Sequence, residues 1–149
     1  MPSLVLFIQR MHHAGNVGSI FRTAEVMAVD RVIMYGNRSY SEAVTKGSHQ
    51  WLTLEFTEDP DIIDRFKSDG FRIVGIENDE NAVSMYDYKF HPKSMLVLGS
   101  EMGGIEAAIY PKLDDTVIIP QYGVTGCLNV VHAGGIALYE YRRQYPFIS

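Results

Sequence analysis

The sequence predicts an α/β fold with a largely parallel sheet. Short continuous apolar runs, which are typical of strands buried on both faces, alternate along the 149 residues with helical patterns. No repeat, low-complexity tract or linker divides the chain. Because alternating strands and helices build parallel sheets, we expect residues 1–149 to form a single domain of this kind.

The first half of the chain is predicted to alternate three strands with two helices. The apolar run Leu4 to Gln9 predicts the first strand, and Arg31 to Tyr35 and Leu52 to Phe56 predict the next two. Asn16 is a favoured capping residue and predicts a helix that continues to about Ala28. Residues 41–46 predict a short helix that ends at Gly47.

The second half continues this alternation. Asp59-Pro60-Asp61 predicts the start of a helix, because proline suits the first turn, and Gly70 predicts its end. Strands are predicted over 71–77, 95–99 and 115–119. The polar segment 78–89 and a short helix over 105–110 are expected to connect them.

Residues 118–144 are expected to organise the fold. Pro120 ends the preceding strand, because proline has no N–H to donate to the sheet. From Cys127 through Tyr139, apolar side chains fall on nearly all sides, which predicts a helix buried on most of its faces. Gly134 and Gly135 each cost about 1 kcal/mol relative to alanine within a helix. They therefore predict a close backbone contact, either with another helix or at a dimer interface.

Composition and charge restrict the function classes. One cysteine, Cys127, excludes an internal disulfide and fits a reducing compartment. The apolar run Leu4 to Ile8 is too short for a signal peptide and no segment could span a membrane, so we expect a cytoplasmic protein without a membrane partner. The net charge of −5 argues weakly against nucleic acid, but residues 1–50 carry five Lys/Arg against three Asp/Glu. A local basic face is therefore compatible with the acidic total.

Three kinds of chemistry lack their signatures. The side chains of His12 and His13 do not face one another and have no Cys or His partner at zinc spacing, so no metal site is predicted. Cys127 is a candidate nucleophile at a helix N-terminus, but no base is identifiable beside it. Neither G-x-x-x-x-G-K-[ST] nor G-x-G-x-x-G occurs, which disfavours nucleoside triphosphates and dinucleotides.

Three separated segments, in order along nearly the whole chain, resemble one family. They are N-V-G-S-I-F-R at 16–22, L-V-L-G-S-E-M-G-G-I at 96–105, and I-P-Q-Y-G-V-T-G-C-L-N-V at 119–130, which is followed by Y-E-Y-R-R-Q at 139–144. Together they resemble the SpoU/TrmH branch of the SPOUT methyltransferases. In that branch the segments read N-x-G-x-x-x-R, L-x-x-G-x-E-x-x-G-I and I-P-M-x-G-x-x-x-S-L-N-V, with Y-E-x-x-R-Q at the end.

The resemblance implies a fold, a cofactor, a substrate and an assembly. The implied fold is an α/β sheet with helices on both faces and a deep trefoil knot at its C-terminal end, where S-adenosylmethionine is held. The implied protein is a homodimer that methylates a ribose 2′-oxygen in RNA, with tRNA favoured over rRNA. The alternative from another class is a knotted RNA- or cofactor-binding protein with little catalysis. Base methylation through Cys127 is a third hypothesis.

The resemblance also assigns site residues by position. The catalytic positions are Asn16, Arg22, Glu101 and Asn129. The cofactor positions are Ile76, Gly99, Ile119, Cys127 and Leu128. From the residues alone, Arg22 also fits a solvated arginine paired with Glu25, and Asn129 also fits a helix cap. Asn16 and Arg22 lie about 120° apart around an ideal helix, so they converge only if Asn16 stands before the helix.

Arg22 is expected to position the substrate and to stabilise developing negative charge, because an arginine hardly deprotonates in proteins. Two residues depart from the family pattern: Cys127 replaces its serine and Gln121 replaces its usual methionine. A thiol is a weaker hydrogen-bond partner than a hydroxyl, so the serine's role does not carry over to Cys127. The candidates for phosphate contact, which also fit ordinary surface charge, are Arg10, Arg31, Arg38 and Lys46.

Overall fold

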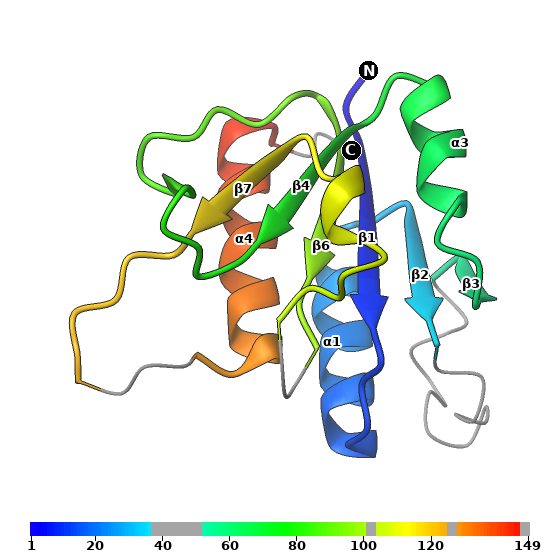
Figure 1. Cartoon of the computed structure of the whole chain (residues 1–149), viewed down its shortest axis with the longest axis horizontal. Helices are drawn as coiled ribbons and strands as arrows, with labels where there is room; N and C mark the ends of the chain where they lie inside the picture. Colours follow the sequence, from blue (N-terminus) through cyan, green and yellow to red (C-terminus); the bar gives the residue numbers. More distant parts are fainter. Residues whose placement is uncertain (37–51, 101–103, 125–127, 147–149) are drawn as a thin grey trace.

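A computed structural model describes residues 1–36, 52–100, 104–124 and 128–146. Within these residues the strands form one seven-stranded sheet in the order β3-β2-β1-β6-β4-β7-β5, and every neighbouring pair is parallel. The predicted parallel α/β sheet is confirmed (Figure 1). The strands are β1 (Ser3–Gln9), β2 (Arg31–Tyr35), β3 (Leu54–Thr57), β4 (Arg72–Ile76), β5 (Val83–Ser84), β6 (Lys93–Leu98) and β7 (Asp115–Ile118).

Helices cover both faces of the sheet. α1 (Ala14–Val26) and α4 (Val130–Gln144) lie side by side on one face, and α3 (Ile62–Ser68) packs on the other (Figure 1). Neighbouring residues of β1 divide between the two cores: Leu6 joins the first and Phe7 the second, as the alternation of a strand requires. In the part of the chain that the structure describes, no helix is long and apolar enough to cross a membrane.

Two connections differ from the predictions, and a third lies outside the described residues. The segment 105–110 is a turn that leads into a short 3-10 helix, η2 (Tyr110–Lys112), because Pro111 removes a hydrogen bond that an α-helix would need. The polar segment 78–89 contains the short edge strand β5. The predicted helix over 41–46 lies outside the described residues.

α4 is buried along one face only, so the prediction of burial on most faces is wrong. Its buried residues are Gly134, Ala137, Leu138 and Tyr141. On the outward side, Ile136 and Tyr139 are 43% and 65% exposed. The pattern misled because apolar side chains occupy both sides of the helix, and a single chain covers only one of them.

The tandem glycines of α4 have different surroundings. A Cβ on Gly134 would lie 2.8 Å from Ile20 Cδ1 of α1 and 2.9 Å from Leu98 Cδ1 of β6. A Cβ on Gly135 would meet only Thr23 Cγ2, at 3.8 Å. The close contact that the glycines predicted is therefore helix packing, and it belongs to Gly134.

The last turns of α4 hold the far end of α1. Arg142 donates from Nε to the Met27 carbonyl and from Nη2 to the Ala28 carbonyl, both at 2.7 Å. Ala28 has a φ of 55°, which turns the chain out of the helix. Gln144 Oε1 accepts from the Phe90 N–H at 2.8 Å. The Y-E-Y-R-R-Q segment thus joins α1 to the chain that precedes β6.

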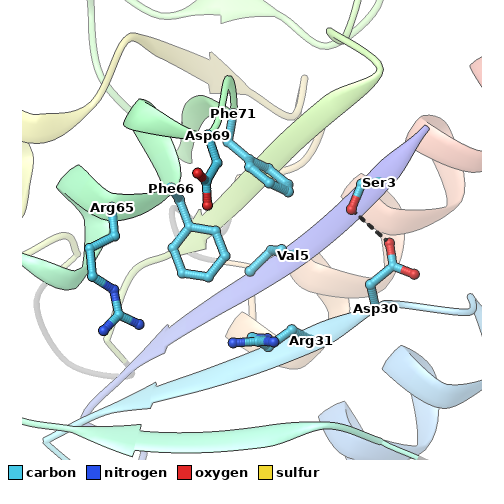
Figure 2. A pocket seen from close by; sticks show the side chains of 8 residues that line it. All are labelled: Ser3, Val5, Asp30, Arg31, Arg65, Phe66, Asp69 and Phe71. Atoms are coloured by element: carbon cyan, nitrogen blue, oxygen red, sulfur yellow. Dashed lines mark hydrogen bonds between the residues drawn. The ribbon is translucent and has the colours of Figure 1, made fainter. Parts of the chain in front are cut away.

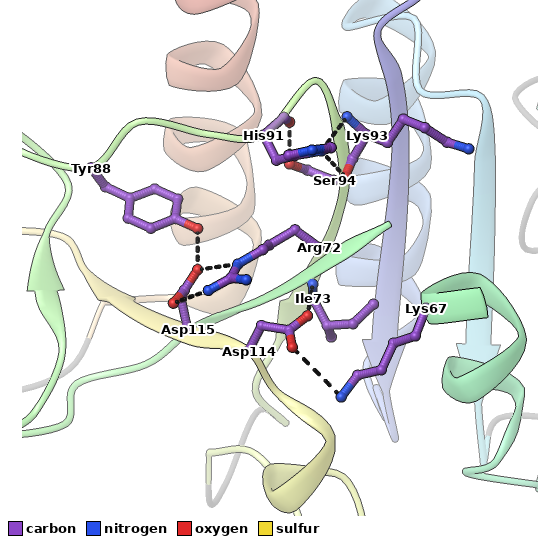
Figure 3. A network of polar contacts seen from close by, with 9 residues as sticks. All are labelled: Lys67, Arg72, Ile73, Tyr88, His91, Lys93, Ser94, Asp114 and Asp115. Atoms are coloured by element: carbon purple, nitrogen blue, oxygen red, sulfur yellow. Dashed lines mark hydrogen bonds and ion pairs between the residues drawn. The ribbon is translucent and has the colours of Figure 1, made fainter. Parts of the chain in front are cut away.

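A polar network closes the amino end of the sheet (Figure 3). Arg72, the first residue of β4, donates two hydrogen bonds of 2.9 and 3.0 Å to Asp115, the first residue of β7. Tyr88 donates its hydroxyl to the same carboxylate at 2.6 Å. The hydrogen bonds from Arg72 lower the pKa of Asp115. Because Arg72 is half exposed, the pair stabilises the fold by only about 1 kcal/mol or less.

We expect Gly134→Ala to be less stable than Gly135→Ala by about 1–3 kcal/mol. Both variants gain the same helix propensity, but only the first crowds Ile20 and Leu98. Chemical denaturation of the two variants beside the wild-type protein measures the difference. Equal free energies of unfolding for the two variants would contradict the packing at Gly134.

Candidate functional site

Three predicted cofactor positions meet at the carboxyl edge of the sheet. Ile76, the last residue of β4, is in register with Leu98 of β6 and Val117 of β7. Gly99 directly follows β6 and Ile119 directly follows β7. The structure therefore brings Ile76, Gly99 and Ile119 to one edge, and the carboxyl ends of parallel strands commonly form ligand sites.

The chain turns back tightly after β6. The Ser100 N–H donates to the Gly104 carbonyl at 2.9 Å. A Cβ on Gly99 would lie 2.9 Å from Gly104 Cα, so backbone packs on backbone there. Gly104 itself has a φ of 72°, in the left-handed region that favours glycine. Glycine is therefore required at both positions for this turn to form.

Two polar side chains from neighbouring strands hold this turn. Glu77 Oε2 accepts from the Ile105 N–H at 2.8 Å. Gln9, which is fully buried at the end of β1, donates to the Leu98 carbonyl at 2.7 Å and accepts from the Glu106 N–H at 2.9 Å. Sequence reasoning missed both residues. The available signal was a single polar residue directly after an apolar strand run.

α1 carries two predicted catalytic residues on different sides. Asn16 is the third residue of the helix, and the prediction that it caps the helix is wrong, because His13 is the last extended residue (φ −87°, ψ 120°). Arg22 therefore lies about 120° around and about 9 Å along the axis from Asn16. One chain does not bring these two side chains together. Arg22 is exposed, and among the described residues no ion pair joins it to Glu25.

Asn129 is the N-cap of α4. Its Oδ1 accepts from the Val131 N–H at 2.8 Å, which confirms the cap interpretation, while a ligand-facing role stays a prediction. Leu128, beside it, is 38% exposed. Two further predicted site residues, Glu101 and Cys127, lie outside the described residues.

The starts of α1 and α4 lie at the edge where Gly99 follows β6. α1 follows the carboxyl end of β1, and Gly134, just over one turn into α4, packs against Leu98, the last residue of β6. Figure 1 shows the first turns of both helices at the same end of the sheet as the arrowheads of β1 and β6. Asn16 and Asn129 therefore belong to helix ends that face the edge carrying the predicted cofactor positions.

A separate pocket of about 300 Å³ lies at the opposite end of the strands (Figure 2). Arg31 and Arg65 line it, and both pair with Glu55, at 3.2 and 3.5 Å. Ser3 donates to Asp30 at 3.1 Å. Because the arginines already face a carboxylate of the same chain and the pocket is far from the predicted positions, we do not assign the site to it.

The fold is a parallel α/β domain in which three of the predicted cofactor positions lie at the carboxyl ends of central strands. The model of the SpoU rRNA Methylase family matches residues 3–139, and this chain belongs to that family. A tRNA (guanosine(18)-2′-O)-methyltransferase from Aquifex aeolicus is 32% identical over 146 residues, which cover 95% of this chain and 69% of that protein.

Solved structures share the fold. The crystal structure of the A. aeolicus TrmH/SpoU tRNA modifying enzyme matches with a TM-score of 0.87 and 31% identity, over 97% of this chain and 76% of that one. The SpoU methyltransferase AviRb from Streptomyces viridochromogenes, in complex with the cofactor AdoMet, matches with a TM-score of 0.85 and 25% identity, over 96% of this chain and 60% of that one. The present chain is thus shorter than each of these proteins.

We expect Asn129→Ala to lose about 1 kcal/mol of stability, because the Val131 N–H loses its acceptor. Asn129→Ser keeps an oxygen acceptor at the cap and should stay within about 0.5 kcal/mol of the wild-type protein. Thermal unfolding of the three proteins measures both effects. An alanine variant as stable as the wild-type protein would contradict the cap.

Proposed function

We propose that this chain is an S-adenosylmethionine-dependent RNA methyltransferase that modifies a ribose 2′-hydroxyl, with tRNA favoured over rRNA. The observation that carries the proposal is its 32% identity, over 95% of its length, to the Aquifex tRNA (guanosine(18)-2′-O)-methyltransferase. The family description names rRNA, which is therefore the second substrate. The Aquifex relative is a bacterial tRNA-modifying enzyme, and this similarity supports a cytoplasmic location for the present protein.

The carboxyl edge suits S-adenosylmethionine. Leu128 and Ile119 offer partly exposed apolar side chains, and the ends of β4, β6 and β7 offer backbone donors and acceptors for an adenosine. AviRb, which shares this fold, is a cofactor complex. When bound, S-adenosylmethionine supplies an electrophilic methyl group on sulfur. The residues that we propose to hold it are Ile76, Gly99, Ile119, Cys127 and Leu128.

For the reaction, this chain must orient a ribose oxygen and stabilise the negative charge that develops on it. Arg22 is exposed and no ion pair joins it to another described residue, so its guanidinium can contact a phosphate or the developing oxyanion. It is not the base, since arginine stays protonated. The other residues that we propose for the catalytic set are Asn16, Glu101 and Asn129.

We also propose a homodimer that forms through the outward face of α4. Tyr86, Tyr122 and Tyr139 are 72%, 84% and 65% exposed, and Tyr122 and Tyr86 join through their hydroxyls at 3.1 Å. A hollow of about 320 Å³ lies between β5 and α4, lined by Met85, Tyr86, Gly135, Ile136, Tyr139 and Glu140. Exposed aromatic clusters of this kind are typical of protein interfaces. In such a dimer, Arg22 of one subunit can act at the cofactor edge of the other subunit.

A trefoil knot at the C-terminal end belongs to the same proposal. β4 lies between β6 and β7, although both follow it in the sequence. The chain after β7 must then return from one side of the sheet to the start of α4, beside the end of β6. The support is this strand order together with the family resemblance, since knots are otherwise nearly absent from proteins.

Transfer of a labelled methyl group from S-adenosylmethionine to bulk RNA, followed by nucleoside analysis, tests the activity. A labelled 2′-O-methylnucleoside in the tRNA fraction is expected. Label in rRNA alone would change the substrate. A labelled base with unmodified ribose would instead support base methylation, and binding of cofactor and RNA without transfer would support the non-catalytic alternative.

Arg22→Lys is expected to lose about 100-fold in turnover while its affinity for S-adenosylmethionine stays within a few-fold. An ammonium group cannot reproduce the planar, bidentate contacts of a guanidinium. Arg65→Lys, an exposed change on the α3 face, is the matched control and should keep full turnover. Single-turnover kinetics and calorimetry on both variants decide, and full activity in Arg22→Lys would remove Arg22 from the mechanism.

Tyr139→Glu should shift the protein from dimer to monomer at micromolar concentration, because it places a charge in the exposed aromatic surface. The control is Val26→Glu, at a residue that is 70% exposed at the end of α1. Sedimentation velocity measures the assembly, and circular dichroism confirms that both variants are folded. A monomeric wild-type protein, or a dimeric Tyr139→Glu variant, would refute this interface.

A further inference from the structure

We propose that Gln9 is a positioning residue that fixes the geometry of the cofactor edge. The proposal rests on the proposed function, because it concerns how this chain binds S-adenosylmethionine. It is carried by one buried amide that joins the two ends of the segment 99–106.

The Gln9 side chain uses both halves of its amide on this segment. Nε2 donates to the carbonyl of Leu98, which directly precedes Gly99, at 2.7 Å. Oε1 accepts from the N–H of Glu106, which directly follows Ile105, at 2.9 Å. A rigid planar group that holds both ends sets the distance between them. It therefore fixes where the end of the turn, at Glu106, lies relative to Leu98 and Gly99.

Because Gln9 is buried, water cannot replace either of its two hydrogen-bond partners. In the part of the chain that the structure describes, Gln9 and Ser94 are the two buried polar side chains, and both are fully buried. An amide without access to water cannot exchange a lost partner for a solvent molecule. Removal of Gln9 therefore leaves the Leu98 carbonyl without this donor in the interior and removes the direct link between Leu98 and Glu106.

The residue after Gln9, Arg10, also contacts Glu106. Consecutive side chains of a strand normally point in opposite directions. Arg10, however, has a φ of 35°, and its Nε reaches the Glu106 carboxylate at 2.7 Å. Gln9 and Arg10 thus hold the same residue, one by its backbone and the other by its side chain. Because Arg10 is 47% exposed, its ion pair is the weaker of the two contacts.

Glu77 completes the arrangement from the opposite side. Its carboxylate accepts from the Ile105 N–H, one residue before the contact made by Gln9. Gln9 stands at the end of β1 and Glu77 directly after β4, and these strands flank β6 on either side. The turn after β6 is thus held between its two neighbours. β1 also continues into α1, so Gln9 connects this turn to the segment that carries Asn16.

Two variants of Gln9 test the proposal. Gln9→Met keeps the length and apolar fit of the side chain but cannot make either contact. Gln9→Glu keeps an acceptor for the Glu106 N–H and, when ionised, places an oxygen against the Leu98 carbonyl. We expect the Kd for S-adenosylmethionine to rise about tenfold in Gln9→Met and in Gln9→Glu at pH 8. The KM for tRNA should stay within about twofold. Loss of folded protein would lower the number of binding sites but leave the Kd unchanged, so the rise in Kd separates the positioning role from misfolding.

The glutamate variant also provides a rescue. Lowering the pH from 8 towards 5.5 protonates a buried carboxyl, and the protonated acid can again donate to the Leu98 carbonyl. We expect the affinity of Gln9→Glu, relative to the wild-type protein at the same pH, to recover over this range. If Gln9→Met fails to fold, this recovery decides the question, and its absence would overturn the proposal.

Ser94→Ala is the matched control. Ser94 is the other buried polar residue, and it donates to the His91 carbonyl at 2.5 Å near the start of β6, away from the cofactor edge. This variant should lower the melting temperature but leave the Kd for S-adenosylmethionine within about twofold of the wild-type value. An equal loss of affinity in Ser94→Ala, or unchanged affinity in Gln9→Met, would overturn the positioning role. A wild-type protein that binds no S-adenosylmethionine would overturn the proposed function itself, and this role with it.

Discussion

The insertion of β6 between β1 and β4 is the constraint on which the rest of the structure depends. β6 pairs in parallel with both neighbours, so segments from the beginning, middle and later part of the chain leave the sheet at one edge. Gln9 can reach the Leu98 carbonyl, 89 residues away, only because of this pairing. The same pairing sets Ile76 opposite Leu98, directly before Gly99, and the edge that we propose for the cofactor is thus a result of strand order.

Both ends of the sheet combine ion pairs with side-chain contacts to backbone groups, and they differ in how deeply those contacts are buried. At the amino end, charged side chains face one another, as in the pairs of Arg72 with Asp115 and Arg31 with Glu55. At the carboxyl end, the Arg10–Glu106 pair stands beside Glu77 and the fully buried Gln9, whose side chains contact backbone groups of β6 and of the turn after it. Charge pairs between exposed residues adapt to solvent, whereas contacts with backbone groups specify where the main chain lies. The end that we propose for the cofactor is the one where the fully buried Gln9 makes such contacts.

The sequence was sufficient for the strands with continuous apolar runs, but it was insufficient for the two-residue strand β5 and for relations between elements. Continuous apolar runs predicted β1, β2, β4, β6 and β7, because strands covered on both faces leave little choice of residue. The one-sided burial of α4 could not be predicted, since Ile136 and Tyr139 look like core residues until the packing is known. The cap at Asn129 was a local property and was predictable, but Asn16 is inside its helix because His13 is extended. The hydrogen-bond partners of Gln9 depend on the order of the strands in the sheet, which the pattern of a single sequence does not predict.

The contact of Arg142 with Met27 and Ala28 has a mechanical consequence. It links the carboxyl end of α4 to the turn that leaves α1, while Gly134 packs against Ile20 further along the same pair of helices. The two helices are therefore anchored to each other at two levels and would open as one cooperative unit in hydrogen exchange.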